Sequence, residues 1–492
     1  MLVIEKHPEG VKRMKKYIYV LLLTGLIFRI AISFRTYSGD VSNHIIWGKD
    51  AVDQGLQGLY ERNFEKLYGH TSPNYPPLTI LIFAFLYLIK NWIYQIAWFL
   101  NLRFPIFPSN LIFLLKEFDY YPYLLKLPAI FADIGIAYIS YLFLNKIRVK
   151  NQVTNKLITL FILFNPAYFY NSAYWGQTDS IPLFFLLVSF YILIYQKKFL
   201  TSAILFTLGL LSKQTIIIFI PLYLIVLFHL SNLSRHSDPE LVEGEESSDP
   251  PAGGKRKLRF GMSNVPSLDF SVTSLLRNDS LRSFIIVSLV TFIIFWLFFL
   301  PFYQNGNPLL FPLTTYLNKI ILVSGLPFTS NHAFNFWYLL TGSRTTLASS
   351  KFIFNISYEI LGYLVTGIIS FLILFRLCIR SQNNYIRNFF YAGFLIPLTS
   401  FIFLTKIHER HLIVTLPFLL LLTINNKFLL VTYIYISLFN FLNMYHNWWS
   451  PNFFYLQKLL STDFVINVLT IGLLIFYFLL LLRFFKSESK NY

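Results

Sequence analysis

Asp40 is the residue best placed to do chemistry in this chain, because it follows the first long apolar segment by only a few residues. It lies in the stretch Tyr37-Ser38-Gly39-Asp40. Charged residues make up only 13% of the 492-residue chain, so a carboxylate at the end of an apolar segment stands out. A carboxylate can act as a general base that takes a proton from a hydroxyl group. We therefore treat Asp40 as a candidate catalytic base. The alternative is a cap for the next helix, a position that Asp favours.

Several other polar residues lie beside apolar segments and carry groups that bind sugar hydroxyls or phosphates. These candidate substrate-binding residues are His44, Tyr75, Trp175, Gln177, Asp179, Lys213, Gln214, His408, Glu409, Arg410 and His411. Cationic neighbours stabilise a departing phosphate, and an Arg side chain can contact it through two parallel hydrogen bonds. For Lys213 the alternative is a side chain that extends from a helix end to the interface. For Trp175 it is the ordinary aromatic belt, and for Glu409 with Arg410 it is a surface ion pair.

Metal binding is a weaker interpretation of the same residues. His408 and His411 stand three residues apart and could share a metal ion, but two ligands do not make a site. The segment that follows the first span has no paired carboxylates of the kind that hold metals. We expect neither a metal nor a cofactor.

The elements that must position these groups are strongly apolar. Hydrophobic residues make up 55% of the chain and aromatic residues 19%, which is more than a soluble domain could bury. A bilayer needs about 20 apolar residues for each helical span. The apolar segments are continuous rather than alternating, which excludes a closed β-barrel. We predict an all-α polytopic membrane protein of 12–14 transmembrane helices, with segments at residues 17–34, 122–145, 157–172, 180–196, 199–212, 214–230, 283–303, 356–378, 387–404, 410–425, 428–446 and 463–483.

The net charge of +18 is a topology signal, and we do not expect nucleic acid as a partner. If the amino terminus is cytoplasmic, most Lys and Arg residues fall in cytoplasmic connections, as the positive-inside rule requires. Both termini are then cytoplasmic, and the motifs around Asp40, Tyr75, Asp179, Lys213 and His408 face outward. We expect an integral protein of the plasma (inner) membrane with an extracytoplasmic active site. Nucleotide-activated donors are absent on that face, so an activated donor must arrive attached to a lipid.

Residues 77–115 leave the number of spans open. The segment 77–100 is apolar enough to cross a membrane, yet one added span would invert every later loop. Either 77–100 lies against the outer leaflet, or it forms a two-pass hairpin with 104–115. Both arrangements preserve the orientation of the later loops.

The chain divides at residues 231–282, which are rich in Ser, Pro, Glu and Arg. This composition cannot bury a core, so we predict a disordered cytoplasmic linker. The linker separates an amino-terminal membrane block, 1–230, from a carboxy-terminal block, 283–492. The first block contains a long outer loop, 35–121, and the second contains an outer loop at 304–355.

Three ionisable residues within the apolar segments need polar partners. Inserting Arg29 into the first span costs about 2.5–3.5 kcal/mol if it is unpaired, so we expect a partner for it. Lys126 and Asp133 lie seven residues apart on one helical face. We expect both to make structural polar contacts inside the bundle.

The order and spacing of the motifs resemble the GT-C glycosyltransferases that use polyprenyl- or dolichyl-phosphate sugars. The nearest similarity is to the dolichyl-phosphate-glucose glucosyltransferases of N-glycan precursor synthesis and to prokaryotic homologues of the GPI-anchor mannosyltransferases. The matching motifs are Gly39-Asp40 with Trp47, Tyr75-Pro76-Pro77-Leu78-Thr79, Lys126 to Asp133, Asn165-Pro166, Trp175-Gly176-Gln177-Thr178-Asp179, Lys213-Gln214 and His408-Glu409-Arg410. They cover most of residues 17–425, and the insertion at 231–282 departs from the family pattern.

The resemblance implies a GT-C-like fold with a long first extracytoplasmic loop, and it places the family's catalytic base on Asp40. It implies transfer of a hexose, mannose or glucose, from a polyprenyl- or dolichyl-phosphate donor to a lipid-linked or glycan acceptor among membrane lipids. A phosphate leaves readily, so one base suffices, unlike the two carboxylates of glycoside hydrolases. Inversion at the anomeric carbon is expected. The alternative function is a lipid-glycan flippase or transporter, which would place polar residues along a path through the membrane.

Overall fold

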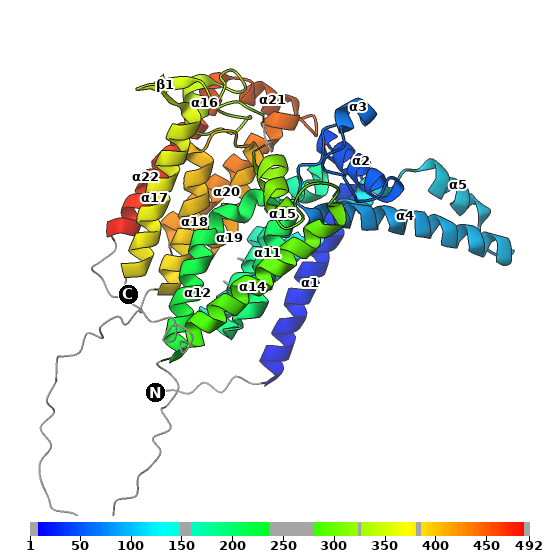
Figure 1. Ribbon diagram of the computed structural model, residues 1–492, viewed down its shortest axis with the longest axis horizontal. Helices are drawn as coiled ribbons and strands as arrows, with labels where there is room; N and C mark the ends of the chain where they lie inside the picture. Colours follow the sequence, from blue (N-terminus) through cyan, green and yellow to red (C-terminus); the bar gives the residue numbers. More distant parts are fainter. Residues whose placement is uncertain are drawn as a thin grey trace, which may run out of the picture.

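The computed structural model describes residues 8–147, 159–235, 279–322, 326–379, 385–424 and 426–486. These residues form helices almost throughout, and the sheet that they contain has two short strands. The predicted all-α class is confirmed. Figure 1 shows a bundle of long helices with smaller elements, including α2, α3, α16 and α21, gathered at one end.

The amino-terminal half alternates long apolar helices with short connecting turns. Its α-helices are α1 (Pro8–Ser33), α2 (Gly39–Asp53), α3 (Phe64–Tyr68), α4 (Pro77–Arg103), α5 (Ser109–Glu117), α6 (Tyr121–Leu124), α7 (Leu127–Lys146), α9 (Pro166–Phe169), α10 (Ser180–Tyr191), α11 (Phe199–Ser212) and α12 (Ile220–Arg235). Wider or tighter helical turns extend them at η1 (Tyr170–Trp175), η2 (Ile192–Gln196) and η3 (Gln214–Phe219).

The carboxy-terminal half also consists of long apolar helices joined by shorter elements, and it contains a small β-hairpin. Its elements are α14 (Asp279–Phe299), η4 (Leu300–Phe302), α15 (Phe311–Thr315), η5 (Tyr316–Ile321), α16 (Phe336–Thr341), β1 (Lys351–Ile353), β2 (Ile356–Ser357), α17 (Tyr358–Ile379), α18 (Tyr385–Phe403), η7 (Glu409–Thr415), α19 (Leu416–Leu422), α20 (Lys427–Trp448), α21 (Phe454–Leu460) and α22 (Asp463–Lys486). The predicted outer loop 304–355 therefore contains short helices and β1.

Eight helices among the described residues are long and apolar enough to cross a membrane. Three shorter apolar helices accompany them, at Tyr17–Ser33, Ser180–Gln196 and Phe199–Ser212. The predicted apolar segments coincide with helical structure wherever the chain is described. The segment 157–172 is broken at Asn165-Pro166, because Asn165 caps the short helix α9 and proline cannot continue the preceding hydrogen-bond ladder. Of the predicted linker, residues 236–278 lie outside the described residues.

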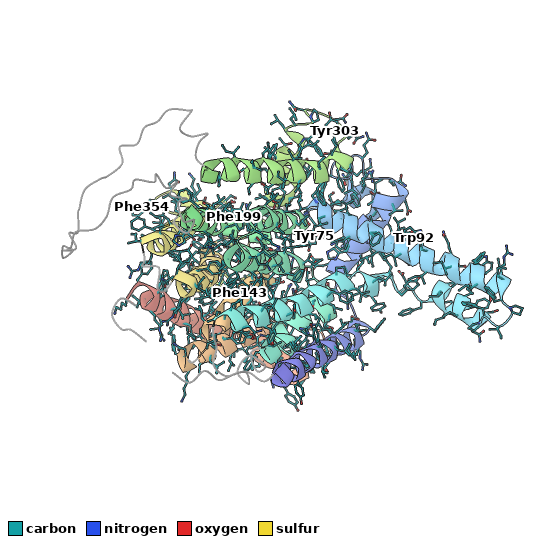
Figure 2. The ribbon with its side chains drawn as sticks, turned by 90° about the horizontal axis from the view of Figure 1, so that it is seen from below. Tyr75, Trp92, Phe143, Phe199, Tyr303 and Phe354 are labelled. Carbon is teal, nitrogen blue, oxygen red and sulfur yellow. The ribbon has the colours of Figure 1, made fainter. Side chains whose placement is uncertain are left out.

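Helix α4 runs crosswise to the bundle. Pro76 and Pro77 start it, since proline is suited to the first helical turn. In Figure 1, α4 extends sideways beyond the steep helices α1 and α17, and Figure 2 shows Trp92 on its projecting part and Tyr75 near its inner end. The next helix, α5, has nine residues and is about 14 Å long, too short to cross a bilayer. The structure therefore gives the predicted hairpin no second spanning helix, and α4 itself is one of the eight helices long and apolar enough to cross a membrane.

Buried ion pairs and hydrogen bonds hold the apolar helices in register. Arg29 in α1 donates to the Asp133 carboxylate in α7 at 2.9 Å, and both side chains are fully buried. Asp133 also accepts hydrogen bonds from Ser172 and Ser180. Arg29 thus has the partner that its position in the first span required. Asp133 makes the structural contacts expected of it.

Candidate functional site

A cavity of about 890 Å³ opens between α2, the loop that follows it, and the segments around residues 213 and 408. Eight predicted site residues line it: Asp40, His44, Tyr75, Lys213, Gln214, His408, Arg410 and His411. The structure thus gathers residues from four separate parts of the chain around one space.

Asp40 lies in the first turn of α2 and is half-buried. The N-cap of this helix is Ser38, whose extended backbone precedes the helix. The Asp40 side chain does not serve as the cap; its Oδ2 atom accepts a hydrogen bond from Gln177 Nε2. Its other oxygen, Oδ1, has no hydrogen-bond partner among the described residues. A negative charge is favourable at a helix N-terminus, so the site holds a carboxylate with one oxygen fixed and one available.

Gln177 reaches Asp40 because η1 approaches α2 closely. Gly176 ends η1 with a φ of +92°, a conformation that favours glycine. A Cβ atom at Gly176 would lie 2.5 Å from Val41 Cγ2, so the two segments could not meet with a larger residue there. The Tyr75 hydroxyl donates to Gln177 Oε1 at 3.4 Å from the opposite side.

The Lys126 side chain joins the two segments that carry Asp40 and Gln177. Its Nζ atom donates to the carbonyls of Ser33 and Thr36 on one side. On the other side it donates to the Ala173 and Tyr174 carbonyls of η1, at 2.9 and 3.0 Å. Lys126 is fully buried, so the hydrogen bonds from its Nζ atom to these carbonyls are shielded from solvent. The polar contacts expected of Lys126 are confirmed, and they tie the chain just before α2 to η1.

Lys213 and Arg410 bring positive charge to the cavity, and each is anchored by a buried carboxylate. Lys213 Nζ lies 2.7 Å from Asp179 Oδ1, and it also lies 5.0 Å above the centre of the Tyr75 ring. Arg410 Nη1 lies 3.1 Å from Glu409 Oε1, and Arg410 Nε is 3.9 Å from Asp179 Oδ2. Asp179 thus faces both cations.

The electrostatics of the carboxylates follow from these contacts. Burial acts to raise the pKa of Asp179, but Lys213, Arg410 and His411 outweigh it and the pKa is lowered. For Glu409 burial prevails over Arg410, so its pKa is raised. Burial alone would lower the pKa of Arg410, and the nearby Asp40 and Glu409 raise it instead. Arg410 is therefore a permanent cation beside Asp40.

Three histidines that line the cavity, His44, His408 and His411, have lowered pKa values. Burial lowers the pKa of His44 to about 3, against the opposing charge of Asp40, and its ring stacks on Phe83 at 4.6 Å. Burial and Arg410 lower the pKa of His411 to about 3 and that of His408 well below its usual value. The lowered pKa values favour the neutral rings of His408 and His411, which can hydrogen-bond a phosphate without carrying charge. No group of three or more possible metal ligands occurs in the described ranges.

Four predicted residues lie behind the cavity wall instead of lining it: Trp175, Gln177, Asp179 and Glu409. Trp175 stacks on Trp448 at 5.8 Å. The other three contact lining residues directly, as described above. Gln177, Asp179 and Glu409 therefore form a layer behind the groups that face the cavity.

Several lining residues escaped the sequence analysis. Asn43 and His70 come from α2 and the first loop, and Lys319 and Arg344 come from the second loop. The sequence could have indicated Asn43, because it stands three residues after Asp40 and so shares its helical face. Arg344 had no such signal. It reaches the cavity because its loop pairs with the chain at His408 through backbone bridges, and its φ of +52° is unusual for a side chain of its size.

Comparison with protein families gives one match across most of the chain. The model described as the ALG6, ALG8 glycosyltransferase family matches residues 75–487. The match includes Lys213 and the segment from His408 to His411, and it begins after Asp40 and His44. No curated protein matches the chain.

Proposed function

Because the chain belongs to the ALG6, ALG8 glycosyltransferase family, we propose that it moves a hexose, mannose or glucose, from a polyprenyl- or dolichyl-phosphate to a lipid-linked or glycan acceptor. Its long apolar helices make it an integral membrane glycosyltransferase. One observation carries the more specific proposal: Asp40 lines the same cavity as Lys213 and Arg410. A base and two cations are the groups that transfer from a lipid phosphate requires.

Asp40 is the general base. Gln177 fixes its Oδ2 atom, which leaves Oδ1 to accept the proton of an acceptor hydroxyl. The acceptor oxygen then bonds to the anomeric carbon while the bond from that carbon to the phosphate oxygen breaks. The proton ends on Asp40, and the electron pair leaves with the lipid phosphate. Attack opposite to the leaving phosphate inverts the anomeric carbon.

Lys213 and Arg410 hold the phosphate as its negative charge grows. Such groups act strongly when they are already oriented before the reaction and little water surrounds them. Asp179 orients both cations, and Glu409 holds the Arg410 guanidinium at 3.1 Å. The neutral His408 and His411 add hydrogen bonds without further charge. No separate general acid is needed, because a phosphate is a good leaving group at neutral pH.

The charge distribution supports an extracytoplasmic site with both termini in the cytoplasm, by the positive-inside rule. This orientation requires that α4, which runs crosswise to the other long helices (Figure 1), lies along the membrane surface, because a spanning α4 would invert every later loop. A membrane-impermeant label at a cysteine introduced in the loop after α2 tests this. We expect labelling of intact cells, and labelling only after lysis would overturn the orientation.

The function is tested by donor choice. Purified protein in lipid nanodiscs receives labelled polyprenyl-phosphate mannose, polyprenyl-phosphate glucose, or the corresponding nucleotide sugars, each with a panel of polyprenyl-diphosphate-linked oligosaccharides. We expect transfer from one lipid-phosphate sugar and none from the nucleotide sugars, with an inverted anomer in the product by NMR. Transfer from a nucleotide sugar, or retention of the anomer, would overturn the proposal.

A further inference from the structure

The walls of the cavity differ in charge. Lys213 and Arg410 face it from one side, and the exposed Arg344 is close enough to His408 to lower the pKa of that histidine. The wall built by α2 and the first loop instead carries Asn43, His70 and carboxylates. A donor phosphate is attracted to the wall that carries Lys213 and Arg410. The wall built by α2 and the first loop is then left to face the acceptor.

The one arginine that this loop contributes to the cavity is already occupied. Arg62 forms an ion pair with the buried Asp50. Its Nη2 atom also donates to the carbonyls of Gly55 and Gln57, both at 2.7 Å. These contacts close the loop onto itself and engage the guanidinium through both of its Nη atoms. The loop itself therefore holds the Arg62 side chain, and Asp50 balances its charge.

Asn43 and His70 form a hydrogen-bonded pair on this wall. His70 Nδ1 and Asn43 Oδ1 are 3.0 Å apart. An amide oxygen only accepts, so His70 Nδ1 is the donor in this pair, and Nε2 is the ring nitrogen left for a further hydrogen bond. Asn43 Nδ2 keeps two N–H groups that have no partner among the described residues. The pair thus presents the Asn43 amide and the His70 Nε2 atom side by side, and a sugar hydroxyl can bond to both because that group donates and accepts.

The pair is placed beside the candidate base. Asn43 follows Asp40 by three residues in α2, so both side chains lie on one face of the helix. His70 joins this face through its bond to Asn43. A hydroxyl group held by the pair is then next to the carboxylate that must take its proton.

We propose that Asn43 and His70 form the acceptor subsite, which binds hydroxyl groups of a neutral sugar on the acceptor glycan. The exposed carboxylates Glu61 and Glu65 extend the same wall. Carboxylates accept hydrogen bonds from sugar hydroxyls and repel phosphates, so this wall disfavours the phosphate group of the donor. The second-loop residue Lys319 also lines the cavity, and its charge acts on Glu61. This inference rests on the proposed transferase function.

The test measures donor and acceptor binding separately in the full-length protein. Asn43→Leu and His70→Phe each remove one polar partner of the subsite with similar side-chain size. For each variant, the KM for the acceptor oligosaccharide that the wild type uses best is measured, together with the Kd for polyprenyl monophosphate, the product of the donor. Lys66→Ala, on the exposed side of α3, is the matched control for a change in the same loop.

We expect each variant to raise the acceptor KM about tenfold, the effect of one lost hydrogen bond, and to leave the Kd for polyprenyl phosphate within twofold. Lys213→Met should raise the Kd for polyprenyl phosphate and leave the acceptor KM nearly unchanged. Lys66→Ala should change neither value. An unchanged acceptor KM in both variants, with intact Asp40-dependent transfer, would overturn the subsite and leave the proposed function standing. Equal losses for donor and acceptor would also overturn it, because the pair would then act only on the fold. If the wild type transferred to no acceptor, the proposed function and this inference would both fail.

Discussion

The pair formed by Lys213 and Asp179 allows the structural and functional roles of one cation to be separated. Both side chains are almost fully buried, at 2% and 1% exposure, and their charged atoms are 2.7 Å apart. Replacing one partner of a buried ion pair typically costs about 3–5 kcal/mol, because the other charge is left uncompensated. In Lys213→Met, Asp179 keeps Arg410 at 3.9 Å, so we take the lower end, about 3 kcal/mol.

This loss of stability should be repaired by neutralising the second partner. With an unfolding entropy of about 2.1 cal/mol/K per residue, 3 kcal/mol corresponds to a fall of about 3 °C in Tm for a chain of this length. In Lys213→Met/Asp179→Asn no buried charge lacks its partner, and the Tm should return to within about 1 °C of the wild type. Thermal unfolding in lipid nanodiscs, followed by tryptophan fluorescence, measures both shifts.

The affinity for the lipid phosphate should not recover in the double variant. A hydrogen bond to a charged group contributes about 1.5–3 kcal/mol, so losing Lys213 should weaken polyprenyl phosphate about tenfold to hundredfold. Both the single and the double variant should show this loss in the measured Kd. If the double variant regained wild-type affinity as well as stability, Lys213 would be a structural residue and its role in phosphate binding would be refuted.

Three further predictions follow from the same contacts. Gly176→Ala should lower kcat at least tenfold and reduce Tm, because its Cβ would meet Val41 at 2.5 Å; Gly39→Ala, with open space around it, should change neither value. Lys126→Met should cost about 3 kcal/mol of stability by leaving buried carbonyls unpaired; an unchanged Tm would contradict this. The pKa of His44 falls from 6.5 to about 3 on folding. The stability that the protein has with a neutral His44 is therefore fully present above pH 6.5 and is lost as the pH falls from 6.5 toward 3. The Tm of the wild type should therefore fall more than that of His44→Gln between pH 7 and pH 5; equal falls would refute the assignment.

The sequence predicts the helices well because the bilayer imposes a length and a polarity on every span. It also predicts that Arg29 needs a partner, since a lone cation is costly in hydrocarbon. It does not identify Asp133, which lies 104 residues away. Many helix arrangements would satisfy the same hydrophobic pattern, and only the packed bundle selects one pair.

The candidate site shows the same division. The residue types of Asp40, Lys213 and Arg410 mark them as candidates, because charged groups are rare beside apolar segments. The bond between Gln177 and Asp40 spans 137 residues and depends on how closely η1 approaches α2. Arg344 could not be predicted, since its position follows from the pairing of an irregular loop with His408. Local chemistry is therefore readable from the sequence, while the partners are set by tertiary contacts.

The role of Asp40 as the catalytic base is tested most directly by Asp40→Asn. The amide keeps the size of the carboxylate and can still accept a hydrogen bond from Gln177, but it cannot take a proton at neutral pH. The measurement is single-turnover transfer of labelled hexose from a polyprenyl-phosphate donor, with the Kd for polyprenyl phosphate as a control for folding and donor binding. A general base contributes about 10²–10⁴-fold to the rate, so transfer should fall by at least about 100-fold while the Kd stays within about threefold of the wild type. Transfer within about threefold of the wild-type rate would contradict the assignment of Asp40 as the base.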